Sequence, residues 1–212
     1  MKLQISALHW ESVNARAILR QSIDNHLDIV QQLSSQFHII ESIAAEMLES
    51  LHAGGTIFWC GNGGSAADCQ HMAAEFVGRF RRERQGLASV ALTTDTSAMT
   101  AIANDYGFDQ IFRRQVEALC APGDVVVGIS TSGNSQNVCL ALQEAKKLGA
   151  LTVSFTGAHG GKLIAVSDLA LRIASTETAR IQEAHILAGH LLCDLVEQAH
   201  CSNRASSEGD IQ

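Results

Sequence analysis

The chain has 212 residues, of which 46% are hydrophobic, so it is long and apolar enough for one domain with a full core. A formal net charge of −7 excludes a general affinity for nucleic-acid backbones or anionic membranes. Six cysteines without CxxC spacing, no basic-then-apolar leader and no membrane-length apolar run predict a protein of the reducing cytoplasm.

Residues 1–53 are predicted to be helical. Apolar residues recur at helical spacing from Ile40 to Leu51, and the sequence Ala53-Gly54-Gly55 is expected to end that helix. Another helix is expected upstream, from about Glu11 to Gln32. Such a region can cap the sheet or contact another subunit. Its apolar residues have little sheet left to cover, so we favour the contact with another subunit.

Strands and helices alternate over the rest of the chain. The five expected strands are short apolar runs, at Thr56–Cys60, Ala88–Thr93, Val125–Ile129, Leu151–Phe155 and Leu169–Ala174. The expected helices are Ala66–Arg79, Ser97–Ala103, Gln110–Leu119, Gln136–Leu148, a short one after Lys162, and Thr178–His200. This alternation predicts an α/β fold, a doubly wound five-stranded parallel sheet with helices on both faces. We expect a turn at 104–107 and a frayed polar tail at 201–212.

Two polar turns follow the first and third expected strands. The first, GNGGS at 61–65, precedes a helix N-terminus, where backbone amides and the helix dipole favour an anion. The second, STSGNS at 130–135, places four hydroxyls at the start of another helix. One side chain would be enough for an ordinary helix cap, so we favour a phosphate cradle. No GxGxxG or GxxxxGK[ST] pattern supports a dinucleotide or nucleoside-triphosphate pocket.

An imidazole and a carboxylate share one face of the helix after the first turn. His71 and Glu75 are four residues apart, a spacing that suits a metal site or an acid/base pair. The ordinary alternatives are a half-buried histidine and a carboxylate that balances the basic cluster Arg79–Arg84. That cluster, RFRRER, is expected to be a solvated helix end rather than a phosphate or subunit contact.

Five segments carry a family resemblance: CGNGGSAADCQHMAAEFVGRF, TAIANDYGF, GDVVVGISTSGNSQNV, FTGAHGGKL and TARIQEAHILAGH. Together they resemble the sugar isomerase (SIS) domain and, within it, the phosphoheptose isomerase family. The resemblance implies a single SIS domain over residues 1–200, with helices at 1–53 and an α/β core at 54–200. It also implies a homotetramer with zinc that interconverts sedoheptulose 7-phosphate and D-glycero-D-manno-heptose 7-phosphate, the first step toward the ADP-heptose of lipopolysaccharide.

The resemblance assigns roles to individual residues. The zinc ligands would be His71, Glu75, Gln182 and His190, with Glu75 and His190 as the acid/base pair. The substrate would contact the two turns, the segment after the second strand and both site helices, at Asn62, Gly63, Gly64, Glu75, Asn104, Asp105, Ser130, Thr131, Ser132, Ser135 and Gln182. A carboxylate and an imidazole can move the protons of an enediol reaction while a metal steadies its negative charge.

The last helix raises a geometric difficulty. Gln182 and His190 are eight residues, ~12 Å, apart along a helix, which is long for two ligands of one ion. Either the helix is irregular there or a neighbouring subunit supplies one ligand, and we favour the shared site. For His185 and His190, a packed and hydrogen-bonded histidine is the ordinary alternative.

A non-catalytic relative supplies the rival hypothesis. It is the SIS-fold tetramer that binds the bacterial replication initiator, and it shares the glycine turn, the AIAND segment and the ARIQE helix start. That relative lacks counterparts of Glu75 and His190, both present in this chain. We therefore expect an aldose–ketose isomerase.

Overall fold

The computed structural model describes residues 13–209, with side chains described as far as residue 202. Five parallel strands form one sheet in the order β2-β1-β3-β4-β5. Their bounds are β1 Ile57–Gly61, β2 Ser89–Ala91, β3 Val125–Ser130, β4 Leu151–Thr156 and β5 Leu169–Arg172. The predicted five-stranded parallel sheet is confirmed. β2 and β5 are shorter than predicted, because each is an edge strand with one neighbour.

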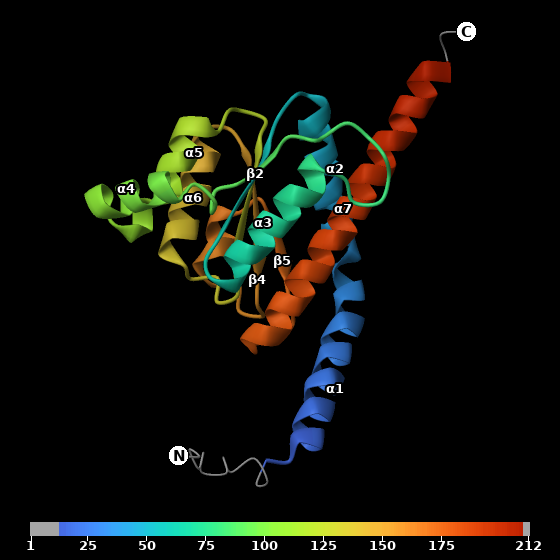
Figure 1. Cartoon of the computed structure of the whole chain (residues 1–212), viewed down its shortest axis with the longest axis vertical. Helices are drawn as coiled ribbons and strands as arrows, with labels where there is room; N and C mark the ends of the chain where they lie inside the picture. Colours follow the sequence, from blue (N-terminus) through green and yellow to red (C-terminus); the bar gives the residue numbers. More distant parts are fainter. Residues whose placement is uncertain (1–12, 210–212) are drawn as a thin grey trace, which may run out of the picture.

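Helices cover both faces of this sheet (Figure 1). They are α1 Ala15–Leu33, α2 Phe37–His52, α3 Gly64–Val77, α4 Thr96–Tyr106, α5 Arg113–Leu119, α6 Gln136–Lys147 and α7 Thr178–Gly209, with 3-10 helices at Ser34–Gln36, Phe108–Gln110 and Gly161–Val166. α2, α3 and α7 share one core with Trp59 and its face of the sheet, while α5 and α6 share the other with Phe58. Over residues 13–209, no helix has both the length and the apolar character needed to cross a bilayer.

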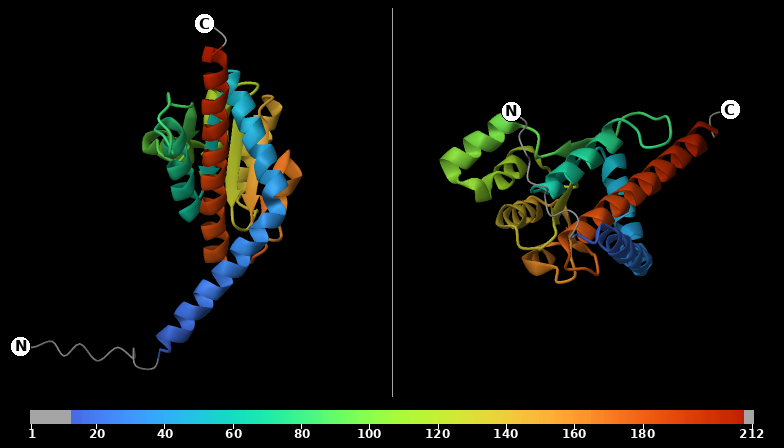
Figure 2. Two further views of the ribbon diagram at one scale, coloured as in Figure 1. Left: turned by 90° about the vertical axis from the view of Figure 1, so that its right-hand side faces the viewer. Right: turned by 60° about the horizontal axis from the view of Figure 1, so that its bottom comes forward.

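The N-terminal helix projects beyond the sheet. α1 runs away from the body of the molecule in two views (Figures 1 and 2). Its apolar residues Ile18, Leu19, Ile23 and Leu27 are 57%, 62%, 59% and 50% exposed. An apolar helix face of this extent supports the expected subunit contact, which stays a prediction.

Parts of the secondary structure differ from the prediction. Residues 104–106, expected as a turn, form the last turn of α4, and the helix ends at Gly107, whose φ of 90° allows its N–H to bond to Ala103 O. Residues 201–209, expected to fray, continue α7 as far as Gly209, because no glycine or proline precedes Gly209 in this stretch. The N-terminal region holds two helices, as expected, and the 3-10 turn Ser34–Gln36 separates them. Residues 1–12 and 210–212 lie outside the described residues.

The strand order identifies one edge of the sheet as the place for a ligand. β1 and β3 are neighbours, and the chain continues from β1 to one side of the sheet and from β3 to the other. Ligands of such sheets bind in the crevice at the carboxyl ends of the strands where this reversal occurs. Both polar turns follow those two strands.

Candidate active site

The two polar turns are joined by a pair of amide side chains. Asn62 Nδ2 donates to Asn137 Oδ1 at 2.9 Å, and Asn137 Nδ2 donates to Asn62 Oδ1 at 2.8 Å. Asn137, on the first turn of α6, is 2% exposed, so the reciprocal bonds fix the glycine turn against the start of that helix. Sequence reasoning did not find Asn137, since its partner becomes apparent only when β1 and β3 are neighbours. Gly63 and Gly64 lie exposed at the start of α3.

Three serine hydroxyls converge between β3 and α6. Ser130 Oγ lies 2.9 Å from Ser135 Oγ and 3.4 Å from Ser132 Oγ, and Thr131 lies in the same turn. Ser135 precedes the helix, but its hydroxyl makes no capping bond, so the ordinary cap role does not account for it. Hydroxyls that can rotate, at the positive end of a helix, form a cup suited to a phosphate.

A second cluster lies where α3 crosses α7. His71 Nε2 is 3.1 Å from Glu75 Oε1 and 3.1 Å from His190 Nε2. One ligand atom from each of the three residues lies within 4.8 Å of the others. Two imidazoles and one carboxylate at this separation suit zinc or a similar divalent metal. The structure thus brings together three of the four residues that the resemblance assigned to the metal.

The close approach of the two helices depends on the residues beside the cluster. Gly189 packs on Met72, and a Cβ added at Gly189 would lie 2.3 Å from Met72 Sδ. A larger residue there would therefore push α7 away from α3. Burial, together with the neighbouring His71, lowers the pKa of His190. This favours the neutral imidazole, the form that binds a metal or accepts a proton.

Gln182 lies apart from this cluster within one chain. α7 is a continuous α-helix here, so the alternative of an irregular helix falls away, and the favoured shared site stays a prediction. The Gln182 amide packs on Gly64, where an added Cβ would lie 2.4 Å from its Nε2. Gly64 precedes His71 by seven residues, ~10 Å along α3. The structure therefore places Gln182 beside the glycine turn.

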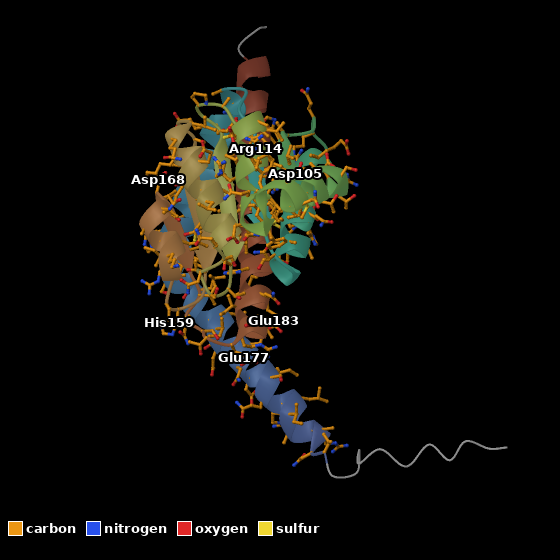
Figure 3. The ribbon with its side chains drawn as sticks, turned by 90° about the vertical axis from the view of Figure 1, so that its left-hand side faces the viewer. Asp105, Arg114, His159, Asp168, Glu177 and Glu183 are labelled. Atoms are coloured by element: carbon orange, nitrogen blue, oxygen red, sulfur yellow. The ribbon has the colours of Figure 1, made fainter. Side chains whose placement is uncertain are left out.

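Asn104 and Asp105 lie on the exposed end of α4. Asn104 Nδ2 donates to Asp105 Oδ1 at 2.8 Å, and α4 has no buried residue. In Figure 3, Asp105 lies in the opposite half of the molecule from His159, which follows β4 at the carboxyl edge of the sheet. The structure does not bring this pair to the two turns of its own chain.

The basic cluster Arg79–Arg84 was predicted wrongly as a solvated helix end. α3 stops at Val77, and the cluster forms a loop that binds α7. Its backbone N–H groups at 80–82 and the Arg84 side chain all bond to the carboxylate of Glu197, which is 0% exposed. Two further ion pairs join the loop to α7, Arg81 with Asp194 and Arg82 with Asp194, both at 2.9 Å.

The cysteines beside the glycine turn are not suited to nucleophilic chemistry. Cys60 and Cys69 are both fully buried. Burial raises the pKa of Cys60 to about 12 and the pKa of Cys69 well above its ordinary value. Both therefore remain thiols at neutral pH.

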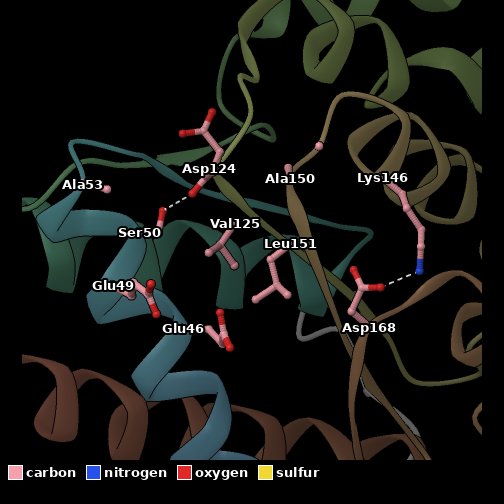
Figure 4. A pocket seen from close by; sticks show the side chains of 12 residues that line it. Glu46, Glu49, Ser50, Ala53, Asp124, Val125, Lys146, Ala150, Leu151 and Asp168 are labelled. Carbon is pink, nitrogen blue, oxygen red and sulfur yellow. Dashed lines mark hydrogen bonds and ion pairs between the residues drawn. The ribbon is translucent and has the colours of Figure 1, made fainter.

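A cavity of about 460 Å³ opens at the other edge of the sheet, at the amino ends of β3 and β4 (Figure 4). The carboxylates of Glu46 and Glu49 line it. Lys146 in the same wall is already paired with Asp168. An acidic wall repels a phosphate, so this cavity does not suit the anionic ligand that the polar turns favour.

His185 is the packed histidine that was expected as the ordinary alternative. It is 1% exposed, and its Nε2 donates to the carbonyl oxygen of Thr156 at 3.3 Å. Burial lowers its pKa to about 4. Unfolded histidine has a pKa of about 6.5, so the unfolded chain binds more protons between pH 4 and 6.5. The contribution of His185 to the free energy of unfolding is therefore fully present above that pH range and is lost as the pH falls through it.

We expect His185→Gln to remove up to ~3 kcal/mol of this pH dependence. The measurement is the free energy of unfolding in urea at about pH 7.5 and 4.5, for both proteins. Burial also raises the pKa of Asp68 to about 6, so Asp68 makes the folded state more stable as the pH falls. This effect is opposite to that of His185, but it is the same in both proteins and cancels in the comparison. The same difference between the two pH values in wild type and variant would contradict the expectation.

Comparison with known proteins agrees with the fold. Residues 21–157 match the family model described as SIS domain. The chain is 51% identical over 186 residues to a phosphoheptose isomerase of Aquifex aeolicus, covering 88% of this chain and 96% of that protein. The solved phosphoheptose isomerase from Neisseria gonorrhoeae matches with a TM-score of 0.83 and 44% identity, over 87% of this chain and 100% of that one. The solved phosphoheptose isomerase from Francisella tularensis matches with a TM-score of 0.85 and 34% identity, over 88% of this chain and 100% of that one.

High identity over nearly the whole length of both proteins is enough to assign the family. The match extends through the segments that carry the glycine turn, the serine turn and the α3 histidine and glutamate. The chain belongs to the phosphoheptose isomerase family of SIS-domain proteins.

Proposed function

We propose that the protein is an aldose–ketose isomerase that converts D-sedoheptulose 7-phosphate to D-glycero-D-manno-heptose 7-phosphate through an enediol. The observation that carries the proposal is the cluster of His71, Glu75 and His190, held by two helices that also border the glycine turn. The names of the relatives support this substrate. In the cell the reaction would begin the synthesis of ADP-heptose for lipopolysaccharide.

The chemistry divides between two side chains. Isomerisation moves one proton between carbons 1 and 2 of the sugar and another between the two oxygens. Glu75 is proposed to take the carbon-bound proton as the base, and His190 to move the proton at oxygen. Their functional atoms lie within 4.8 Å of each other, close enough to act on the carbon and the oxygen of one substrate.

Zinc fits the donor set on α3 and α7. His71, Glu75 and His190 would hold it, with Gln182 of a neighbouring subunit as the fourth ligand, because Gln182 of the same chain lies by Gly64. When bound, zinc would polarise the substrate carbonyl and steady the negative charge of the enediolate.

The sugar phosphate would bind at the carboxyl edge of the sheet. The hydroxyls of Ser130, Thr131, Ser132 and Ser135 would hold the phosphate, while Asn62, Gly63 and Gly64 would line the sugar. Gln182 beside Gly64 would contact the same ligand. Asn104 and Asp105, on the exposed α4, would reach the site of a neighbouring subunit.

A homotetramer with its sites between subunits accounts for several features at once. The exposed apolar face of α1 would be covered, and so would the exposed Tyr106 of α4. All six cysteines are free thiols, which supports the reducing cytoplasm as the compartment.

The test is conversion of sedoheptulose 7-phosphate to the aldose by purified, zinc-replete protein. Turnover is expected with the phosphorylated sugar, and unphosphorylated sedoheptulose is the matched control for the serine cup. Binding to the replication initiator without any turnover would overturn the proposal and favour the non-catalytic relative.

A further inference from the structure

The loop after α3 places an aromatic ring on the imidazole of His190. The two rings of Phe80 and His190 are stacked, with centroids 5.5 Å apart and 23° between their planes. His71 meets the same imidazole edge-on, with centroids 5.0 Å apart. The hydrogen bond of His190 uses Nε2, and among residues 13–202 no partner bonds to its Nδ1.

That arrangement is unusual for a histidine in a metal cluster. Such a ring is commonly oriented by a hydrogen bond at its second nitrogen. For His190, the flat face of Phe80 takes that place, because an offset stack at this distance restricts the plane of the imidazole.

Glu197 holds the backbone that carries Phe80. Its buried carboxylate accepts the backbone N–H groups of Phe80, Arg81 and Arg82 at 2.9, 2.8 and 2.8 Å. Burial opposes ionisation, yet these donors and Arg84 together lower the pKa of Glu197. Three short bonds to an ionised acceptor are strong, so the loop has little freedom to move away from α7.

Arg84 extends the same anchor to the helix of Glu75. Its side chain is 3% exposed, and its Nε lies 3.2 Å from Glu197 Oε1. Its two terminal nitrogens donate to the carbonyl oxygens of Glu75 and Phe76, both at 2.9 Å. These carbonyls belong to the last turn of α3, where intrahelical donors are missing. One buried carboxylate therefore connects the end of α3 to α7.

We propose that Phe80 is a positioning residue for His190, and that Glu197 is the buried anchor that keeps Phe80 against the imidazole. The proposal rests on the proposed isomerase function, which gives His190 its role. With the ring plane held, Nε2 of His190 points toward His71 and Glu75 before metal or substrate binds. Without the Phe80 ring, the imidazole of His190 would have to be ordered each time metal or substrate binds.

The decisive comparison is Phe80→Leu against Phe80→Tyr. Leucine keeps an apolar side chain but removes the flat ring, whereas tyrosine keeps the ring at this half-buried position. Phe80→Leu is expected to lower kcat by about 10- to 100-fold and to weaken zinc binding by a similar factor. Phe80→Tyr should restore both. The KM for the sugar phosphate should change little, since other residues hold the phosphate.

Zinc affinity is measured by chelator competition without substrate, and folding by the melting temperature of each variant. Wild-type kcat and zinc affinity in Phe80→Leu would overturn the proposal, even if the melting temperature fell, because the ring would then be structural only. Under conditions in which Glu197→Gln is folded, this variant is expected to show the same loss of kcat and of zinc affinity. An inactive wild type would instead contradict the isomerase function, while the zinc comparison would still test the positioning role.

Discussion

Glu75→Gln is expected to lower kcat by ~10²-fold or more while the protein still binds the sugar phosphate. Glutamine keeps the size of the side chain beside His71, but its amide cannot accept a proton from carbon. Binding should survive because the serine hydroxyls at 130–135 form a separate cup. Steady-state kinetics with sedoheptulose 7-phosphate measure the first effect, and calorimetric titration of the variant measures the second.

Two measurements separate loss of the base from other causes. Zinc content must be determined in the same preparations, since Glu75 is also proposed as a ligand. Glu83→Gln is the matched control, because Glu83 is 89% exposed and pairs with Arg79 on the surface. A kcat for Glu75→Gln close to that of Glu83→Gln, with zinc retained in both, would show that Glu75 is not the base.

His71→Ala is expected to lose bound zinc and, with it, activity. His71 contacts both other donors of the cluster, at 3.1 Å to Glu75 and 3.1 Å to His190. Changes to residues that merely support a ligand cost 10- to 100-fold in metal affinity, so removal of the ligand itself should cost more than about 10²-fold. The measurement is elemental analysis after dialysis, together with turnover before and after zinc is added back.

His159→Ala serves as the control for that experiment. His159 is exposed in the loop after β4 and is outside the three-residue cluster. It should keep wild-type zinc content. An unchanged zinc-to-protein ratio in His71→Ala would reject His71 as a ligand.

Features that depend on neighbours along the chain could be predicted from the sequence. The run Val125–Ile129 predicted a buried central strand, and His71 with Glu75 predicted one helix face, because strand and helix periodicities are local. The prediction of a turn at 104–107 was wrong, and the reason for this error is also local. Asn104 and Asp105 are frequent in turns, but the residue that can adopt positive φ, and so ends the helix, is Gly107.

Features that depend on distant partners were decided by the tertiary structure. His190 meets His71 across 119 residues, and Asn137 meets Asn62 across 75. RFRRER reads as a solvated charge run because the sequence does not show that Glu197 lies buried against it. The sequence by itself determined the parallel sheet, its two polar turns and the pair on α3. Which side chains face one another was decided by the order of β1 and β3 and by the crossing of α3 and α7, since such contacts follow from how elements pack.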